Sequence, residues 1–177
     1  MKTAIIKRIK LLLICGIVLV ALYAISNFLP FIRVSGSSME PSYTDDEIVY
    51  LNRNTDSIKR GDVVIFKQKL HFYFEEKLIK RVCGIPGDKI YKDTNNNYFA
   101  YDGIYIYYET SRIDTTCDEL LASSTYMYTL SKNSYFCMGD NRDESIDSRT
   151  FGAVDETKII AIVKGGFKKP TPYKKGS

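Results

Sequence analysis

The side chains of this sequence that could carry out catalysis are serines and lysines, because the chain contains a single histidine. A serine nucleophile needs a base that removes its proton, and imidazole is the usual one. The histidine, His71, lies in the run Leu70–Phe74, where strand alternation places it on the opposite face from three apolar side chains. That position is typical of an ordinary half-exposed strand residue. A hydrolase with this sequence would therefore use another base, and lysine can serve when it is desolvated.

Lys80 has the local sequence that such a base requires. In the run Leu78-Ile79-Lys80-Arg81-Val82, a period of two places Lys80 on the same face as Leu78 and Val82. An ordinary lysine has a pKa near 10.4, so only about 0.04% of it is neutral at pH 7. Burial disfavours the cation and would lower this pKa, which would supply a neutral amine. A lysine that reaches solvent from a sheet edge is the alternative explanation.

A pair of serines lies in the small-residue run GSSMEPS at residues 36–42. Gly36 permits a tight backbone, and Pro41 restricts the chain beyond the serines. Ser38 in this run is a candidate nucleophile. Taken alone, the same run would also fit a linker.

Short runs rich in Val, Ile, Tyr and Phe, separated by turn residues, predict that the chain is mainly β after its N-terminal segment. The predicted strands are Ile48–Leu51, Asp62–Phe66, Leu70–Phe74, Lys77–Val82, Tyr98–Tyr101, Ile104–Tyr108, Ser134–Met138 and Ile159–Val163. Only Asp118–Ala122 has a helical pattern. We interpret the tyrosine-rich residues from about 92 to 132 as a variable insertion, either a subdomain or a long hairpin.

The N-terminal segment has the charge pattern of a membrane anchor. Residues 1–10 contain four basic and no acidic side chains, and the 22 residues from 11 to 32 contain no charge. As a helix these residues would cover roughly 33 Å, close to the thickness of the bilayer core. A cleavable signal sequence is the alternative, but its apolar region is normally about 7–15 residues long. The predicted parts are a cytoplasmic segment at 1–10, a single transmembrane helix at 11–32, an extracytoplasmic β domain at 33–168 and a flexible tail at 169–177.

Composition limits the partners of the β domain. Beyond the first ten residues, the remaining 21 basic residues balance the 21 acidic ones. A neutral domain without a basic stripe argues against a nucleic acid partner. Cys83, Cys117 and Cys137 form no close pair, and their spacing fits neither a disulfide framework nor a zinc site.

Four blocks, in this order, resemble those of type I signal peptidases, the membrane-bound serine peptidases that use a Ser–Lys dyad. The blocks are SMEPS at 38–42, RGDVVIF at 60–66, KRVCGIPGD at 80–88 and GDNRDESIDSR at 139–149. The resemblance implies that Ser38 is the nucleophile and Lys80 the general base. It also implies that the Ser145 hydroxyl helps to orient the lysine amine, and that Asp147 and Arg149 form a supporting ion pair.

The sequence departs from the family at the oxyanion hole. Gly36 stands where some members have a serine whose side chain donates to the oxyanion. The hole would therefore use the Ser38 backbone N–H and another donor in the Gly36 region. Glu144 stands where asparagine is frequent.

The function that the resemblance implies is that of signal peptidase I, which cleaves N-terminal signal peptides from exported preproteins after small residues at the outer membrane surface. The implied fold is β-rich, with antiparallel sheets around a curved core, and the implied acyl transfer requires no metal or cofactor. We expect a monomer in the cell membrane, whose partners are preproteins and membrane lipid. Alternatives are a dedicated peptidase of the same family that matures a pilin or conjugation protein, and a non-catalytic membrane-anchored β domain. A repressor-like Ser–Lys autoprotease should carry a DNA-binding helical domain instead of the apolar N-terminal segment.

Overall fold

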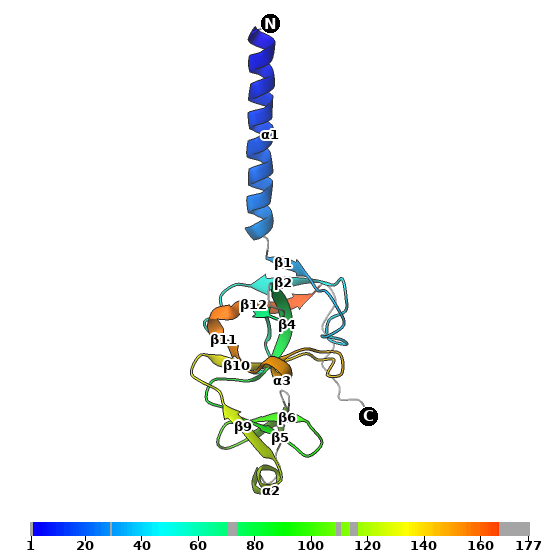
Figure 1. The fold of residues 1–177 in the computed structure, drawn as a ribbon, viewed down its shortest axis with the longest axis vertical. Coiled ribbons are helices and arrows are strands. Elements are labelled where there is room, and N and C mark those ends of the chain that lie inside the picture. The colour runs from blue at the N-terminus through cyan, green and yellow to red at the C-terminus, as the bar shows by residue number, and fades with distance from the viewer. Residues whose placement is uncertain (1, 29, 71–73, 109–110, 114–116, 167–177) are drawn as a thin grey trace. The chain divides into compact units, whose positions relative to one another are not determined.

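The computed structural model describes residues 2–28, 30–70, 74–108, 111–113 and 117–166, and it is mainly β, as predicted. Seven strands form the larger sheet in the order β1-β2-β12-β3-β4-β10-β11 (Figure 1). Their bounds are β1 Phe31–Arg33, β2 Ile48–Asn52, β3 Val63–Lys69, β4 Glu75–Gly84, β10 Ser134–Met138, β11 Val154–Asp155 and β12 Ile159–Gly166, with the short helices α3 Ser148–Phe151 and η1 Glu156–Lys158. The strand pairs with a described register are all antiparallel, as expected.

β3 is buried on both faces of the larger sheet. Because alternate side chains of a strand point to opposite faces, Val63 and Ile65 join one hydrophobic cluster and Val64 and Phe66 join the other. The first cluster also contains the buried side chain of Met39, which comes from the segment between β1 and β2. The sheet thus has a core on each side, and β4, which pairs with β3, lies beside both.

Residues 89–129 form a second antiparallel sheet of five strands, in the order β8-β7-β6-β5-β9. Its elements are β5 Lys89–Lys92, β6 Tyr98–Tyr101, β7 Ile106–Tyr108, β8 Ser111–Ile113, α2 Cys117–Ala122 and β9 Thr125–Thr129. A third hydrophobic cluster, which includes Ile90 and Leu130 from this region and Phe136 from β10, joins the two sheets. The residues interpreted as an insertion therefore form a sheet that begins slightly before residue 92.

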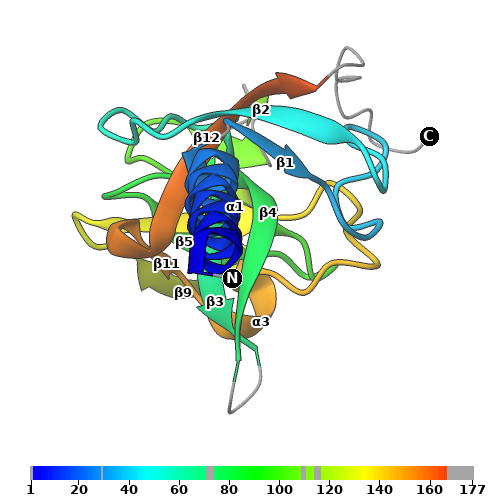
Figure 2. The same ribbon diagram turned by 90° about the horizontal axis from the view of Figure 1, so that it is seen from above.

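Seven of the predicted strands correspond to β2, β3, β4, β6, β7, β10 and β12. The predicted strand Leu70–Phe74 is wrong, because neither Leu70 nor Phe74 lies in a strand. His71 lies outside the described residues. β3 continues to Lys69, which pairs with Glu75 at the start of β4, so the run belongs to the connection between two strands that lie side by side (Figure 2). Alternation of apolar residues does not distinguish such a connection from a strand.

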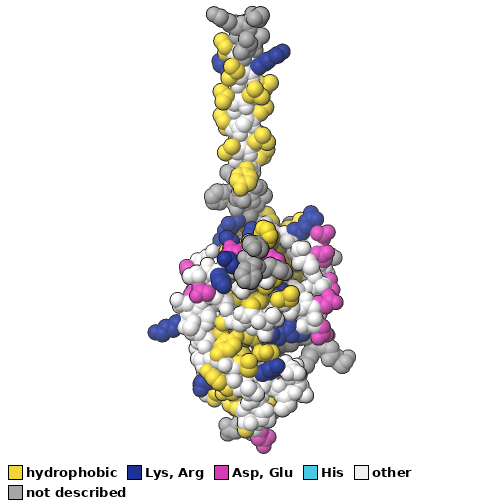
Figure 3. All heavy atoms as spheres, viewed as in Figure 1, with side chains coloured by type: hydrophobic (Ala, Val, Ile, Leu, Met, Phe, Trp, Pro, Cys, Tyr) yellow, Lys and Arg dark blue, Asp and Glu magenta, His cyan; other side chains and the backbone are white. Residues whose placement is uncertain are grey.

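The N-terminal helix α1 runs from Lys2 to Phe28, in the compact unit of residues 1–31. Its side chains from Leu11 to Tyr23 are exposed, and hydrophobic side chains line the face of the helix seen in Figure 3. Among the residues that the structure describes, no helix is both long enough and apolar enough to cross a membrane. The last residues of the predicted span lie in β1 rather than in a helix. The transmembrane segment at 11–32 therefore stays a prediction.

An ion pair between Arg60 and Asp88 connects the two sheets. Arg60 Nη2 donates to Asp88 Oδ2 over 2.8 Å, and the Asp88 side chain is 2% exposed. The same guanidinium donates to the carbonyl oxygen of Cys83 in β4 and lies 3.8 Å from the ring centroid of Tyr107 in β7. Asp88 Oδ2 also accepts the Ile85 N–H over 2.7 Å. Arg60 thus contacts a strand of each sheet and neutralises a buried carboxylate between them.

We predict that Arg60→Ala lowers the free energy of unfolding by about 3–5 kcal/mol, because it leaves the Asp88 carboxylate buried without a cation. Urea unfolding followed by circular dichroism measures this change. The control is Arg33→Ala, which removes an exposed pair with Asp46 at 3.3 Å. The control should change the free energy of unfolding by less than about 1 kcal/mol. Equal effects of the two substitutions would contradict the structural role of the buried pair.

Candidate active site

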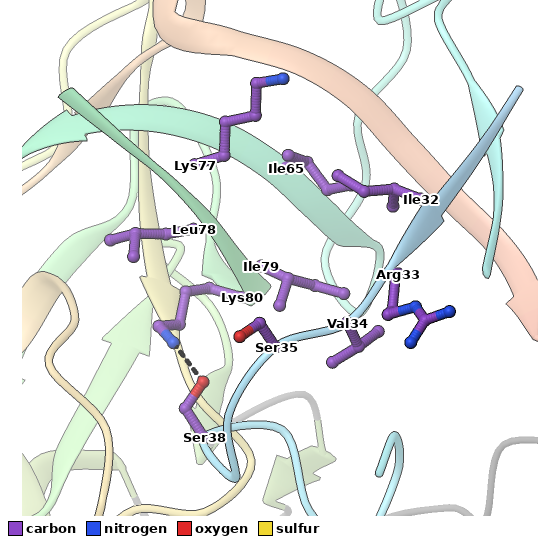
Figure 4. Close-up of a pocket in the computed structure, with 10 residues that line it drawn as sticks. All are labelled: Ile32, Arg33, Val34, Ser35, Ser38, Ile65, Lys77, Leu78, Ile79 and Lys80. Atoms are coloured by element: carbon purple, nitrogen blue, oxygen red, sulfur yellow. Dashed lines mark hydrogen bonds between the residues drawn. The ribbon is translucent and has the colours of Figure 1, made fainter. Parts of the chain in front are cut away.

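Ser38 and Lys80 are in hydrogen-bond contact, although 42 positions separate them in the sequence. Lys80 Nζ lies 2.6 Å from Ser38 Oγ (Figure 4). Ser38 belongs to a turn after β1, and Lys80 belongs to β4. Lys80 is 3% exposed, whereas Ser38 is half-buried at the wall of a cavity. This is the geometry that a serine nucleophile and its base require.

Burial changes the acid–base chemistry of Lys80. Removal from water lowers the pKa of Lys80 from 10.5 to about 8, although the carboxylates of Asp147 and Asp140 act in the opposite direction. At pH 7 about one molecule in ten then carries a neutral amine, a few hundred times more than for an unshifted lysine. The prediction that Lys80 lies on an apolar strand face is confirmed, because Leu78 and Val82 belong to one hydrophobic cluster.

The turn that carries Ser38 is held by apolar packing and by hydrogen bonds. Met39, the next residue, is completely buried in the cluster on one face of the larger sheet. Gly36 has a φ of +87°, a conformation that favours glycine, and its N–H donates to Asp45 Oδ1 over 2.8 Å. The Asn141 N–H donates to the carbonyl oxygen of Ser38 over 3.1 Å. The hydroxyl of Ser38 is therefore presented from a fixed backbone.

Two donors in the region predicted to form the oxyanion hole are already committed. The Gly36 N–H is taken by Asp45, and Ser37 Oγ donates to Glu144 Oε2 over 2.6 Å. No acceptor for the Ser38 N–H is found among the described residues. The Ser38 N–H is thus available to an oxyanion, whereas the Gly36 N–H is not.

Gly139 separates Ser38 from Ser145. A Cβ at position 139 would overlap Ser145 Oγ and would lie 2.5 Å from the carbonyl oxygen of Ser38, so glycine is required there. Ser145 Oγ is buried near the Asp147 carboxylate, but it forms no hydrogen bond of normal geometry within the described ranges. The structure therefore places Ser145 beside the nucleophile turn without the expected contact to the amine of Lys80.

Asp147 and Arg149 form the expected ion pair. Arg149 Nε lies 2.8 Å from Asp147 Oδ1, and Arg149 Nη2 lies 2.9 Å from Asp147 Oδ2. Asp147 is completely buried, and its Oδ2 also accepts the Gly139 N–H over 2.9 Å. Burial would raise the pKa of Asp147, but Arg149 and the Gly139 N–H together hold it below its ordinary value. The carboxylate thus stays ionised and links the glycine to the arginine.

A second buried ion pair, which sequence reasoning did not identify, joins Arg81 to Asp140. Arg81 Nε lies 2.8 Å from Asp140 Oδ1, and Arg81 Nη2 lies 2.5 Å from Asp140 Oδ2. The guanidinium also donates to the carbonyl oxygen of Gly61 and to Ser42 Oγ, over 3.0 and 3.2 Å. Both partners lie within the family blocks, next to residues singled out above. Their pairing could not be read from one sequence.

A cavity of about 100 Å³ opens beside Ser38, between the segment that follows β1 and the strand β4 (Figure 4). Its apolar wall includes Ile65, Leu78 and Ile79. Of β4, only Arg81–Gly84 pairs with β10, so residues 75–80 have β3 on one edge and no described strand on the other. An extended peptide can pair with such an edge and place a small side chain in the cavity.

Comparisons with known proteins identify the family of the chain. The family described as signal peptidase, peptidase S26, matches residues 5–166. Signal peptidase IB of Staphylococcus aureus is 30% identical over 167 residues, which cover 86% of this chain and 85% of that protein. Signal peptidase I P of Bacillus subtilis subsp. natto is 32% identical over 171 residues, which cover 91% and 88%. A crystal structure of a signal peptidase I from Enterococcus faecalis is 20% identical and covers 60% of this chain and 97% of that one, with a TM-score of 0.41.

The family match includes the turn of Ser38, the strand of Lys80 and the loop that contains Ser145. Two curated relatives reach 30% identity or more over most of the chain. The chain therefore belongs to the signal peptidase family, peptidase S26, and is a serine endopeptidase of the signal peptidase I type.

Proposed function

We propose that this protein cleaves N-terminal signal peptides from exported preproteins, with Ser38 as nucleophile and Lys80 as general base. The observation that carries the proposal is the 2.6 Å contact between Ser38 Oγ and the buried Lys80 Nζ. A buried amine with a lowered pKa, placed against a half-exposed hydroxyl, is the arrangement expected of a catalytic site and is not needed by a non-catalytic domain.

The reaction begins with the neutral amine of Lys80. The amine takes the proton of Ser38 Oγ while that oxygen attacks the carbonyl carbon of the scissile bond. The ammonium then donates the proton to the leaving amine, the peptide bond breaks, and an acyl-enzyme remains. Water next loses a proton to Lys80 and attacks the acyl carbon, and the proton returns to Ser38 Oγ as the ester bond breaks. We assign the Ser38 N–H, for which no described acceptor is found, to the oxyanion of both tetrahedral intermediates.

We assign positioning roles to Ser145, Asp147 and Arg149. The buried Ser145 hydroxyl forms no hydrogen bond of normal geometry with the described residues, so it is available to the Lys80 amine when substrate excludes water. Asp147 holds the Gly139 N–H and so fixes the loop that contacts the nucleophile turn. Arg149 compensates a carboxylate that would otherwise hold the lysine protonated.

The cavity supports a preference for small side chains before the cleaved bond. Its volume of about 100 Å³ corresponds to roughly three water molecules. An extended substrate that pairs with residues 75–80 of β4 would place one such side chain there. A space of this size favours a small side chain such as alanine over a large aromatic one.

Members of this family are membrane-associated, and we propose that residues 11–32 anchor this chain. The support is the basic start followed by an uncharged segment, together with the exposed apolar side chains of α1. In this arrangement residues 1–10 are cytoplasmic, and a monomeric β domain from residue 33 onward lies outside, next to lipid. The site would then meet preproteins at the outer membrane surface.

We predict that Lys80→Arg is as inactive as Lys80→Ala, with kcat/KM reduced by about 10³-fold or more. A guanidinium stays protonated and cannot accept the Ser38 proton. In the wild type, kcat/KM should rise with pH through an apparent pKa near 8, because the neutral amine accumulates above the lowered pKa of Lys80. The assay uses a precursor peptide with alanine before the cleaved bond, and circular dichroism verifies that the variants fold. Substantial activity of Lys80→Arg would exclude the dyad, and a limb near pH 4 would indicate a carboxylate base.

Gly139→Ala should lower kcat by about 10²-fold. The new Cβ displaces the Ser38 backbone and the Ser145 hydroxyl, and so misaligns the nucleophile with the carbonyl carbon that it attacks. The matched control is Gly103→Ala, in the turn between β6 and β7, where the φ of +103° strains an alanine but its Cβ would have no neighbour within 4 Å. This control should retain wild-type activity in the same peptide assay. Similar losses in both variants would show that the close approach at Gly139 is not critical.

The topology predicts which part of the chain an external protease can reach. Protease added to spheroplasts should digest the β domain and leave residues 1–10 protected, because the basic segment remains on the cytoplasmic side. Antibodies against tags at the two ends of the chain would identify the surviving fragment. Protection of the β domain together with loss of the N-terminal tag would reverse the orientation.

A further inference from the structure

The cavity at Ser38 continues into a basic surface on the hairpin of β3 and β4. The strand register pairs Ile65 with Ile79 and then Lys67 with Lys77. Because side chains alternate along a strand, these two pairs lie on the same face of the hairpin. Ile65, Ile79 and Lys77 line the cavity, and Figure 4 shows Lys77 at the end of the β4 row farthest from Ser38.

Lys67 and Lys77 are like charges at directly opposite positions, an arrangement that destabilises an antiparallel pair. Both are exposed, and neither has an ion-pair partner in the part of the chain that the structure describes. Glu75 is the carboxylate on this face of the hairpin. It lies opposite Lys69, two residues farther along the strand from the cavity than Lys77. The positive charge beside the cavity is therefore not neutralised within the hairpin.

Arg33 adds a third cation to the cavity wall. Its partner is Asp46, at 3.3 Å, and the two side chains are 65% and 74% exposed. A pair this exposed is weak, so a second carboxylate can compete for the guanidinium. Cations thus approach the cavity from both of its sides, from β1 and from the β3–β4 hairpin.

We infer that the preferred substrates carry an acidic side chain roughly three to five residues before the cleaved bond, since an extended chain advances about 3.3 Å per residue. The inference rests on the proposed function, in which the acyl part of the substrate runs from Ser38 along the free edge of β4. Three positions separate Lys80 from Lys77, which corresponds to about 10 Å along the strand. The flexible stems of Lys77 and Lys67 let their ammonium groups meet a carboxylate there.

The geometry favours a peptide carboxylate over an anionic lipid headgroup as the partner of these cations. Lys77 lines the cavity that begins at the nucleophile, and it lies on the same strand as the base. A peptide that places one small side chain in the cavity and continues in an extended conformation along the free edge of β4 therefore passes this ammonium. A headgroup would neutralise the exposed lysines equally well, but it would not connect them with cleavage.

A charge-swap experiment tests the inference. Three peptides differ only at the fourth residue before the cleaved bond, which is Asp, Asn or Lys. Their kcat/KM values are measured with full-length wild type, Lys77→Glu and Lys67→Glu in a nonionic detergent at low salt. The matched control is Lys89→Glu, which changes an exposed strand lysine of the second sheet.

Wild type and Lys89→Glu should cleave the Asp peptide about five to ten times more efficiently than the Lys peptide, the range expected for one exposed charge pair. Lys77→Glu should abolish or reverse this preference, and Lys67→Glu should reduce it. The preference of the wild type should also shrink at about 0.5 M salt, because screening weakens exposed charge pairs.

The remaining outcomes separate this inference from the proposed function. An Asp-to-Lys ratio that is the same in all four proteins would overturn the inference, while cleavage that still requires Ser38 would leave the function standing. Absence of cleavage by wild type, or equal cleavage by Ser38→Ala, would overturn both. A change in Lys77→Glu that appears only with phosphatidylglycerol vesicles, and equally for the three peptides, would identify a lipid contact and overturn the inference.

Discussion

The site depends on an amine that must lose its proton beside two carboxylates. Desolvation lowers the pKa of Lys80 to about 8, against the opposing effect of Asp147 and Asp140. Each carboxylate accepts two guanidinium N–H groups from one arginine, Asp147 from Arg149 and Asp140 from Arg81. Arg149 acts on the amine in the direction opposite to Asp147, and desolvation prevails over both carboxylates. Buried ion pairs are a poor source of net stability, so we attribute the value of these two pairs to this charge balance.

The same loop that supplies the charge balance also fixes the nucleophile. The Gly139 N–H is bound by Asp147, and the glycine lies against the Ser38 carbonyl group with no room for a side chain. Two residues later, the Asn141 N–H binds that carbonyl oxygen. Displacement of this loop would therefore disturb the environment of the base and the position of the nucleophile together. Because the loop that contains Gly139 and Asn141 acts on both the base and the nucleophile, its backbone must pack directly against the turn of Ser38.

Features that depend on local order could be predicted from the sequence, and features that depend on strand register could not. The alternation around Lys80 is local, so its apolar face was predictable, as were most strands of the larger sheet. The Arg81–Asp140 pair depends on β10 aligning Met138 with Arg81, a contact between segments more than 50 positions apart. The run Leu70–Phe74 has strand alternation, yet its position in the hairpin is set by the pairing of the flanking residues. β5 and β9 mix lysine, threonine and tyrosine, and become strands by pairing with each other and by packing on the third cluster.

β4 also shows how one strand can hold two lysines in opposite surroundings. Lys77 and Lys80 are three positions apart, so the period of two places them on opposite faces. Lys80 points to the side of Leu78 and Val82, where removal from water makes a neutral amine accessible. Lys77 follows the row of Ile79 on the other face and is exposed to solvent. A base and a positive charge can therefore lie within about 10 Å of each other along the strand. The pleat of the strand directs one side chain to apolar surroundings and the other to solvent.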